Sequence, residues 1–447
     1  MNFDAMKTYL QAAAKRAGLQ EYEIYAMSER SVSTETLRHE ISSFSLGESG
    51  GISFRCIVDG KMGYASTELL TEAEMEALVD RAADNARNIE NDDEVLIYHG
   101  SEHYEAVNAP KEDTPDAATL KARALLLERR AYEAHPSVSD GTQAGALAFE
   151  SEILLCNSHG LELHNRVGTS GAYIDAVVKQ DDESVSAFEI TCHGDDTALG
   201  KMAELAVERA RAKLGAGRVP SGATDCIISG RQMSSLLSAF WPMFSAKRVQ
   251  HGMSLLKGRV GERIAADCVT ITDDPRRDAC PIQTSFDGEG VATYRKSVIE
   301  DGVLKTYLYD LTTAQKDGVS STGNGQRGSY TSPVGIAPYC FCLEAGDATQ
   351  EELFAAMGDG LYITELKGIH AGADAVTGDF SLEAAGFRVR EGKLAEPVKT
   401  FTIAGNFLEL LKNIEAVSDT VDYGFPGSFT TFASADVLVR GVSVAGE

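Results

Sequence analysis

The sequence predicts an α+β protein: duplicated helix–antiparallel sheet–helix modules in the N-terminal half, then a mainly antiparallel β, barrel-like C-terminal domain. Two observations lead to this prediction. The order helix, several strands, helix occurs twice, on either side of a linker-like stretch at 91–115 that is rich in Asp, Glu, Asn and Pro. From residue 223 onward, short apolar alternations separated by glycine turns dominate. We therefore expect units at 1–105, 115–218 and 223–447.

The first module begins with a helix at 3–17, where apolar residues recur at a spacing of three and four. Strands follow at 22–26 and 52–58, where apolar and polar residues alternate. A second helix begins at the capping box that Thr71 forms with Glu74. Between the strands, 47–51 matches the GxSxG pattern of a nucleophile elbow. That elbow requires a helix after the serine, and a strand pattern follows here, so we interpret the segment as a hairpin loop.

The second module repeats this order. Its first helix has small and apolar residues facing inward over 120–134, and its last helix covers 197–214. Strands are expected between them, at 146–156, 161–166, 172–179 and 186–192. The glycine-rich segment 215–222 then marks the exit into the last domain.

The last domain is expected to be an antiparallel sheet or barrel. Candidate strands are 268–272, 293–300, 303–309, 337–343, 361–366, 386–390, 397–404 and 435–443, with short helices near 349–357 and 406–414. The domain opens with a strand at 225–229 and a helix at 231–249, whose apolar face includes Met233 and Leu237. Pro242 removes a backbone donor and disfavours the helical conformation of Trp241, so this helix should break there.

Composition restricts the possible functions. The chain has 447 residues and a net charge of −26, which disfavours binding to the phosphate backbone of nucleic acids. No apolar run reaches the ~20 residues of a membrane span, so we expect a cytoplasmic protein without membrane contact. The eight cysteines contain no CxxC pair, and most lie in strand patterns, which is typical of reduced, buried thiols.

Four motifs of the last domain carry a family resemblance. They are DGVL at 301–304, STGNG at 321–325, TGDFS at 377–381 and TIAGN at 402–406. In order and spacing they resemble the TldD/PmbA family, and specifically its PmbA (TldE) branch, over most of the chain. The TldD branch carries an HExxxH helix and a distant C-terminal cysteine as zinc ligands, whereas the PmbA branch lacks them.

The corresponding positions in this sequence carry no zinc ligand. They are Gln232, Ser235 and Leu236 on the 231–249 helix and Ser428 near the C-terminus, which we regard as vestigial metal-site positions. Both parts of the metal site are missing together. The resemblance therefore implies a chain with no catalytic residue and no metal or cofactor of its own.

Two motifs are candidates for a substrate channel, and each has a plainer interpretation. The first motif comprises Thr322, Gly323 and Asn324, and a literal GxGxxG begins at Gly323 and ends at Gly328. No helix follows it, which argues against a dinucleotide site and leaves a channel loop or an ordinary turn. The polar residues of the TGDFS motif are Thr377, Asp379 and Ser381. They could contact a peptide along a sheet edge, or form a glycine turn held by an Asx-type bond from Asp379.

A metal site outside the family pattern is also conceivable from the histidines. His159, His164 and His193 lie within one module, although their sequence context is that of a turn and of exposed strands. His39 is followed by Glu40, but no second histidine completes an HExxH motif.

The resemblance implies a non-catalytic subunit of a TldD/TldE-type metalloprotease that acts on unfolded peptides. Its partner would be a TldD-like subunit that carries the zinc, in a heterodimer, or a second copy of itself, in a homodimer. The alternative is a self-associating peptide-binding protein without a proteolytic role; an autonomous hydrolase has no matching residues. Relatives are often named modulators of DNA gyrase, and the negative charge indicates that any such effect is indirect.

Overall fold

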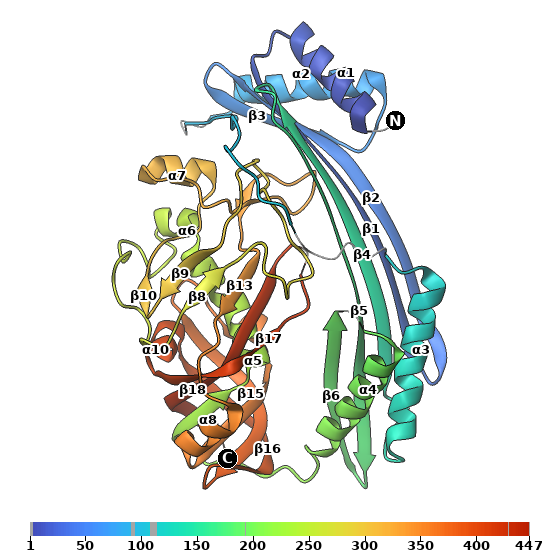
Figure 1. Ribbon diagram of the computed structural model, residues 1–447, viewed down its shortest axis with the longest axis vertical. Coiled ribbons are helices and arrows are strands. Elements are labelled where there is room, and N and C mark those ends of the chain that lie inside the picture. The colour runs from blue at the N-terminus through green and yellow to red at the C-terminus, as the bar shows by residue number, and fades with distance from the viewer. Residues whose placement is uncertain (1–2, 91–93, 108–113, 193, 428, 447) are drawn as a thin grey trace.

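The computed structural model describes residues 3–90, 94–107, 114–192, 194–427 and 429–446. Within these ranges the chain is α+β, with a long curved sheet on one side and a second, partly ring-like sheet on the other (Figure 1). Both sheets are mainly antiparallel. The predicted fold class is confirmed.

The N-terminal half contains the two modules that the sequence predicts, and they share one sheet. The first comprises α1 (Phe3–Arg16), β1 (Glu21–Leu37), β2 (Glu40–Val58), β3 (Lys61–Thr67) and α2 (Glu72–Asn88). The second comprises α3 (Ala117–Ala134), β4 (Gln143–Asn157), β5 (Glu162–Gln180), β6 (Glu183–Cys192) and α4 (Asp196–Arg211). The sheet order is β3-β2-β1-β4-β5-β6, so the pairing of β1 with β4 joins the modules into a continuous surface.

Two predictions for this sheet were wrong because its strands are longer than expected. The GxSxG segment is not a loop: Gly47–Gly51 lies inside β2 and pairs with Met27–Ser31 of β1. The hairpin turn is instead at Arg38 and His39, which have positive φ values of 54° and 66°. The buried carboxylate of Glu128 on α3 accepts the backbone N–H of His39 at 3.1 Å, which stabilises this turn without a glycine. The strands expected at 161–166 and 172–179 are one strand, β5.

The four helices cover one face of the sheet in two pairs. α1 and α2 pack on one half of it, around Ile24 and Phe54, and α3 and α4 pack on the other, around Ala146 and Ile174. Thr71 caps α2, its side chain accepting from the Glu74 N–H, which is one half of the predicted capping box; the Glu74 carboxylate accepts from Arg81 instead. The helices bury the apolar residues of one strand face, so the opposite face is free to meet the last domain.

The last domain contains a closed ring of strands. Its strands are β7 (Gly222–Ile228), β8 (Ile271–Asp273), β9 (Lys296–Glu300), β10 (Val303–Leu304), β11 (Gly325–Gln326), β12 (Gly335–Ile336), β13 (Cys340–Leu343), β14 (Gly360–Lys367), β15 (Asp379–Arg390), β16 (Lys393–Asn406), β17 (Ile414–Tyr423) and β18 (Thr431–Ala445). The order β18-β16-β15-β14-β7 closes because β7 also pairs with β18. This closed ring of strands is the barrel-like part of the last domain.

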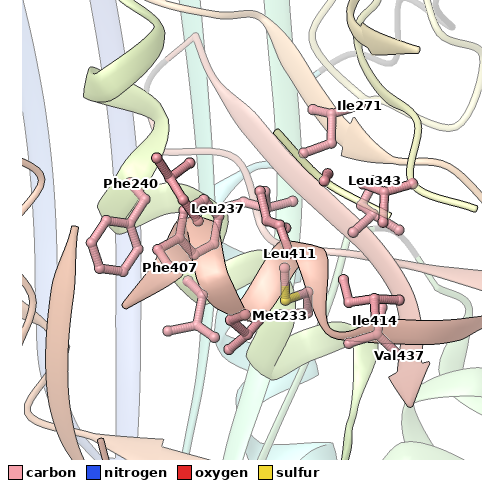
Figure 2. Close-up of a cluster of buried hydrophobic side chains, with 14 of the residues drawn as sticks. Met233, Leu237, Phe240, Ile271, Leu343, Phe407, Leu411, Ile414 and Val437 are labelled. Atoms are coloured by element: carbon pink, nitrogen blue, oxygen red, sulfur yellow. The ribbon is translucent and has the colours of Figure 1, made fainter. Parts of the chain in front are cut away.

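The helices of this domain lie against and between its strands. They are α5 (Gly230–Phe240), a 3₁₀ turn (Trp241–Phe244), α6 (Ala246–Gln250), α7 (Leu311–Asp317), α8 (Gln350–Met357), α9 (Ile369–Gly372) and α10 (Phe407–Lys412). The predicted break at Pro242 occurs, since α5 ends at Phe240. Met233, Leu237 and Phe240 of α5 are fully buried, and the Phe240 ring stacks on Phe407 at 4.5 Å (Figure 2).

Some elements of this domain differ from expectation. The strand expected at 303–309 is only Val303–Leu304, because the chain turns toward α7, which Asp310 caps. Neither α7 nor β17 was predicted. The segment of β17 has few adjacent apolar residues, and its pairing with β18 stabilises it as a strand.

Aromatic side chains from the last domain fit against the free face of the long sheet. Tyr330 lies over Gly51, where a Cβ atom would be 2.4 Å from its ring, and Phe425 lies over Gly171 at 2.3 Å. Between them, Tyr25 and Met27 share a buried cluster with residues of the last domain that include Phe286. The two halves of the molecule therefore form one packed unit. Within the described ranges, no helix is long and apolar enough to cross a membrane.

Candidate functional site

A cleft of about 320 Å³ lies between β6 of the long sheet and the α5–β17 region of the last domain. Its two walls differ in chemistry. One wall is polar and comes from α5, with Arg231, Ser234, Ser235 and Ser238. The other is apolar and aromatic, with Phe188, Ile190, Tyr423, Phe425 and Phe432.

The polar wall is a single face of α5. Residues 231, 234, 235 and 238 follow the spacing of three and four that places side chains on one side of a helix, opposite the buried apolar face. The hydroxyl groups of Ser234 and Ser235 both donate to the backbone carbonyl of Arg231, at 2.8 and 3.0 Å. Their oxygen lone pairs remain able to accept hydrogen bonds from a ligand.

Arg231 connects the two sides of the cleft. Its Nη2 lies 2.8 Å from Oε2 of Glu189 on β6, and its Nη1 donates to the backbone carbonyl of Phe188 at 2.8 Å. Glu189 is buried and also pairs with Arg209 of α4. One carboxylate thus holds two guanidinium groups, and Arg231 is oriented by side-chain and backbone acceptors together.

Two aspartates lie near the first residue of α5. Asp436 Oδ1 accepts the backbone N–H of Gly230 at 2.7 Å, and its Oδ2 accepts from the side-chain amide of Gln350 at 2.7 Å. Asp422 lines the cleft beside it. Burial and, second, the charge of Asp436 raise the pKa of Asp422 above its ordinary value. These groups fix the start of α5 and add acidic character to one end of the cleft.

The structure places the four vestigial metal-site positions differently from one another. Ser235 lines the cleft. Gln232 does not, because its amide bonds to Thr364 O and Leu366 N of β14, both at 3.0 Å, and Leu236 is fully buried in the core. Ser428 lies outside the described residues. Cleft residues Arg231, Ser234 and Ser238 were missed, although their spacing on the polar side of α5 is visible in the sequence.

The cleft face of α5 does not fit a zinc ion. Zinc in proteins is held by thiolate, imidazole or carboxylate groups. This face offers a permanently protonated guanidinium and three neutral hydroxyl groups. In the described part of the chain, no group of three or more His, Cys, Asp or Glu side chains is arranged to hold a metal ion.

The histidines considered for another metal site make separate contacts. His159 Nε2 lies 3.0 Å from Glu21 Oε2, and its ring stacks on His99 at 3.7 Å. His164 Nε2 lies 2.7 Å from Glu152 Oε1. His193 is outside the described residues.

The loop that carries the STGNG motif, residues 321–325, is held by a buried polar network. The amide of Asn324 donates to Asp273 Oδ2 at 2.7 Å, and its carbonyl oxygen accepts from Lys296 at 3.2 Å and from Thr322 at 2.8 Å. Gly323 has a φ of 68°, and a Cβ there would lie 2.9 Å from Ala292 O. In this conformation the side chains of Thr322 and Asn324 stabilise the loop and do not line the cleft, so their predicted role in a channel stays a prediction.

The TGDFS motif forms an exposed turn at the start of β15. The side-chain amide of Asn406 donates to Thr377 O at 2.9 Å and to Asp379 Oδ1 at 3.0 Å, and Thr377 Oγ1 accepts from the Asp379 N–H. The Asx-type bond expected from Asp379 is made instead by Asp374, which accepts from Val376 N at 2.8 Å. Thr377, Asp379 and Ser381 are exposed. Their contact with a peptide stays a prediction.

A second cavity, of about 310 Å³, lies between β2–β3 and α6–α7. Its lining includes Arg55 and Arg327, and both guanidinium groups pair with the buried Glu23 of β1. Glu289, also in the lining, accepts the Leu311 N–H at 2.8 Å. Arg327 belongs to the GxGxxG segment, so this segment joins the last domain to the long sheet through its ion pair with Glu23. No helix follows the segment directly, so it does not form the helix N-terminus that would bind a phosphate.

Comparison with known proteins assigns the class of protein to which this architecture belongs. Models of the PmbA/TldA metallopeptidase domains match along the chain: domain 1 at 22–86, the central domain at 110–214 and the C-terminal domain at 221–446. The chain belongs to the PmbA/TldD family of metallopeptidases.

Individual relatives include proteins named PmbA and TldE. The metalloprotease PmbA of Escherichia coli O157:H7 is 25% identical over 456 residues, covering 99% of this chain and 96% of that protein. A Thermotoga maritima protein described as a candidate modulator of a DNA gyrase has a similar crystal structure, with a TM-score of 0.89, 29% identity and coverage of 99% and 100%. TldE from Thermococcus kodakarensis shares the fold, with a TM-score of 0.88, 23% identity and the same coverage.

Proposed function

We propose that this chain is the non-catalytic, PmbA/TldE-type subunit of a TldD/TldE-type metalloprotease that acts on unfolded peptides. The observation that carries the proposal is the cleft face of α5. At the helix positions where the TldD branch is expected to present zinc ligands, this chain has Gln232, Ser235 and Leu236. The face of this helix that lines the cleft presents Arg231 and three serines. The groups that face this cleft suit binding better than metal-assisted hydrolysis.

The cleft offers complementary contacts for an extended peptide. The hydroxyl groups of α5 can accept hydrogen bonds from peptide N–H groups, and the aromatic wall can bury apolar side chains that an unfolded peptide exposes. Arg231 is already paired with Glu189, so its role is to hold the two walls at a fixed separation. In this proposal the chain guides and retains peptides, and a zinc ion held by the partner would supply the activated water.

The proposal includes a TldD-like partner, a cytoplasmic location and no cofactor in this chain. The net charge of −26 disfavours direct contact with DNA. An effect on DNA gyrase would then be indirect, through a peptide or protein substrate.

The test is to purify the chain alone and together with a TldD-like subunit from the same cells. We expect substoichiometric zinc and no hydrolysis of a labelled unfolded peptide by the chain alone, and chelator-sensitive hydrolysis by the mixture. Replacing the glutamate of the partner's HExxxH helix with Gln should abolish that hydrolysis. Stoichiometric zinc and chelator-sensitive hydrolysis in the partner-free chain would overturn the proposal.

A pull-down from the native cells separates this proposal from the alternative. A TldD-like chain should co-purify if the protein is a protease subunit. Recovery of bound peptide without such a chain, and no hydrolysis after a TldD-like chain is added, would favour a peptide-binding protein without a proteolytic role.

A further inference from the structure

Asp422 supplies the cleft with a carboxylate that has no cation of its own. It lies on β17, one residue before the end of that strand, and it is solvent-accessible. Its Oδ2 lies close to the first turn of α5, where a Cβ atom on Gly230 would be 3.0 Å away. Among the described residues, Asp422 forms no ion pair. A ligand that enters the cleft can therefore reach this carboxylate.

The charges around this end of the cleft do not balance. Arg209 and Arg231 both pair with Glu189. Asp436, the carboxylate beside Asp422, is buried and accepts hydrogen bonds from neutral donors. Two guanidinium groups thus face three carboxylates, which leaves one negative charge without a cation in this part of the described chain. Partial burial and, second, the charge of Asp436 accordingly raise the pKa of Asp422.

Aromatic rings line the same cleft. Phe188 is 48% exposed and Tyr423 is 37% exposed. The Tyr423 hydroxyl accepts from Arg277 Nη1 at 3.3 Å, which restrains this ring from one end. A long cationic side chain can pack its methylene groups and its charged end on aromatic rings, and a guanidinium group stacks on them better than an ammonium group does. Exposed rings beside a carboxylate therefore suit an arginine side chain.

We propose that Asp422 is a specificity-determining residue of the cleft, which favours peptides that carry a cationic side chain, arginine more than lysine. This inference rests on the proposed peptide-binding function and names the class of peptide that binds. The guanidinium group of the peptide pairs with the carboxylate of Asp422, and the rest of the side chain packs on the aromatic wall. Arg231 does not compete for this place, because Glu189 and the backbone carbonyl of Phe188 already hold its guanidinium group.

The test has to separate this local contact from the field of the whole protein. The net charge of −26 attracts any cationic peptide. Asp419 is a matched control position, because it is an exposed aspartate on the same strand and is not part of the cleft lining. Asp419→Asn and Asp422→Asn change the net charge by the same amount. A difference between these two variants therefore reports the contact in the cleft.

The experiment measures the binding of labelled, unfolded decapeptides to the full chain by fluorescence anisotropy. The peptides consist of glycine, serine and one phenylalanine, and they differ at one position, which is Arg, Lys, Gln or Glu. The Arg peptide should bind about tenfold more tightly than the Gln peptide, because an exposed ion pair and a cation–π contact each contribute a few-fold in affinity. The Lys peptide should lie between them. In Asp422→Asn the ratio of Arg to Gln affinity should fall to about twofold, and in Asp419→Asn it should stay near tenfold.

A charge reversal extends the test. Asp422→Lys should make the Glu peptide bind more tightly than the Arg peptide, and circular dichroism should show unchanged folding because the replaced side chain is solvent-accessible. Equal binding of the Arg and Gln peptides by the wild type, or an equal fall of their ratio in Asp422→Asn and Asp419→Asn, would overturn this inference and leave the proposed peptide-binding role in place. Absence of binding by all four peptides would overturn that role and the inference together.

Discussion

Arg231 of α5 and Glu189 of β6 form an ion pair across the peptide cleft, with Nη2 and Oε2 2.8 Å apart. Arg231 belongs to the last domain and Glu189 to the long sheet, so the pair fixes the distance between the two walls. Glu189 is buried and paired with Arg209 as well. Removing a buried carboxylate that holds two cations costs more than breaking a surface pair, because both guanidinium groups lose a charge-assisted hydrogen bond.

Glu189→Gln should therefore lower the free energy of unfolding by about 1–3 kcal/mol, since the amide keeps the shape but loses the charge-assisted bonds. Urea unfolding at neutral pH measures this effect. The control is Glu396→Gln, which removes an exposed carboxylate paired with Arg390 and should leave the unfolding midpoint unchanged. Equal effects of the two substitutions would contradict the assigned role of Glu189.

Gly171 should not tolerate a side chain. A Cβ atom there would lie 2.3 Å from the Phe425 ring and 2.7 Å from Thr191 O. Gly171→Ala should destabilise the protein by about 1–3 kcal/mol, because the ring must shift away from the long sheet. Gly427→Ala is the control, since nothing lies within 4 Å of a Cβ at that position. Thermal unfolding of both variants checks the prediction, and a Gly171→Ala protein as stable as the control would contradict it.

Sequence periodicity predicted best those elements whose structure depends on residues close together in the chain. The apolar face of α5 and its break at Pro242 follow from helix geometry and from the missing proline donor, and both occur as expected. The same helical spacing places Arg231, Ser234 and Ser235 on the opposite side. The polar face of the cleft could therefore be predicted in principle. The family resemblance pointed instead to the expected metal positions, and two of them, Gln232 and Leu236, do not line the cleft.

What could not be predicted depends on pairing between distant segments. Glycine and serine at Gly47–Gly51 favour a loop when considered locally, but pairing with β1 extends the strand through them. The turn at Arg38 and His39 lacks glycine and is stabilised by Glu128, a residue about ninety positions away. The union of both modules in one sheet likewise depends on the pairing of β1 with β4.

The apolar wall should determine affinity for unfolded peptides if the proposed function is correct. Phe188→Ala removes one ring from the cleft while keeping the backbone carbonyl that Arg231 binds. Affinity for a labelled, aromatic-rich unfolded peptide should fall by about tenfold, since one aromatic contact is worth roughly 1.4 kcal/mol here. Fluorescence anisotropy measures the change. Leu205→Ala, an exposed apolar residue of α4 outside the cleft, should bind as the wild type does. A similar loss in both variants would show that the cleft is not the binding site.

Asp287 should make the protein less stable as pH rises from about 4 to 8. This carboxyl group is buried, and burial and, second, the charge of Glu289 raise its pKa to about 8. The folded state then holds a proton that the unfolded state has released, so its stabilising contribution is complete below the unfolded pKa near 3.8 and is lost as pH rises to about 8.

The slope of unfolding free energy against pH measures this effect directly. Within that window, one bound proton corresponds to about 1.4 kcal/mol per pH unit. Asp287→Asn cannot titrate, so its slope should differ from that of the wild type by up to this amount. The amide also replaces one oxygen that accepts the Gly325 N–H, so the variant should be less stable at every pH, and only the slope is diagnostic. Urea unfolding at pH 5, 6, 7 and 8 provides the comparison, and parallel curves would show that Asp287 is ionised throughout because its backbone donors outweigh its burial.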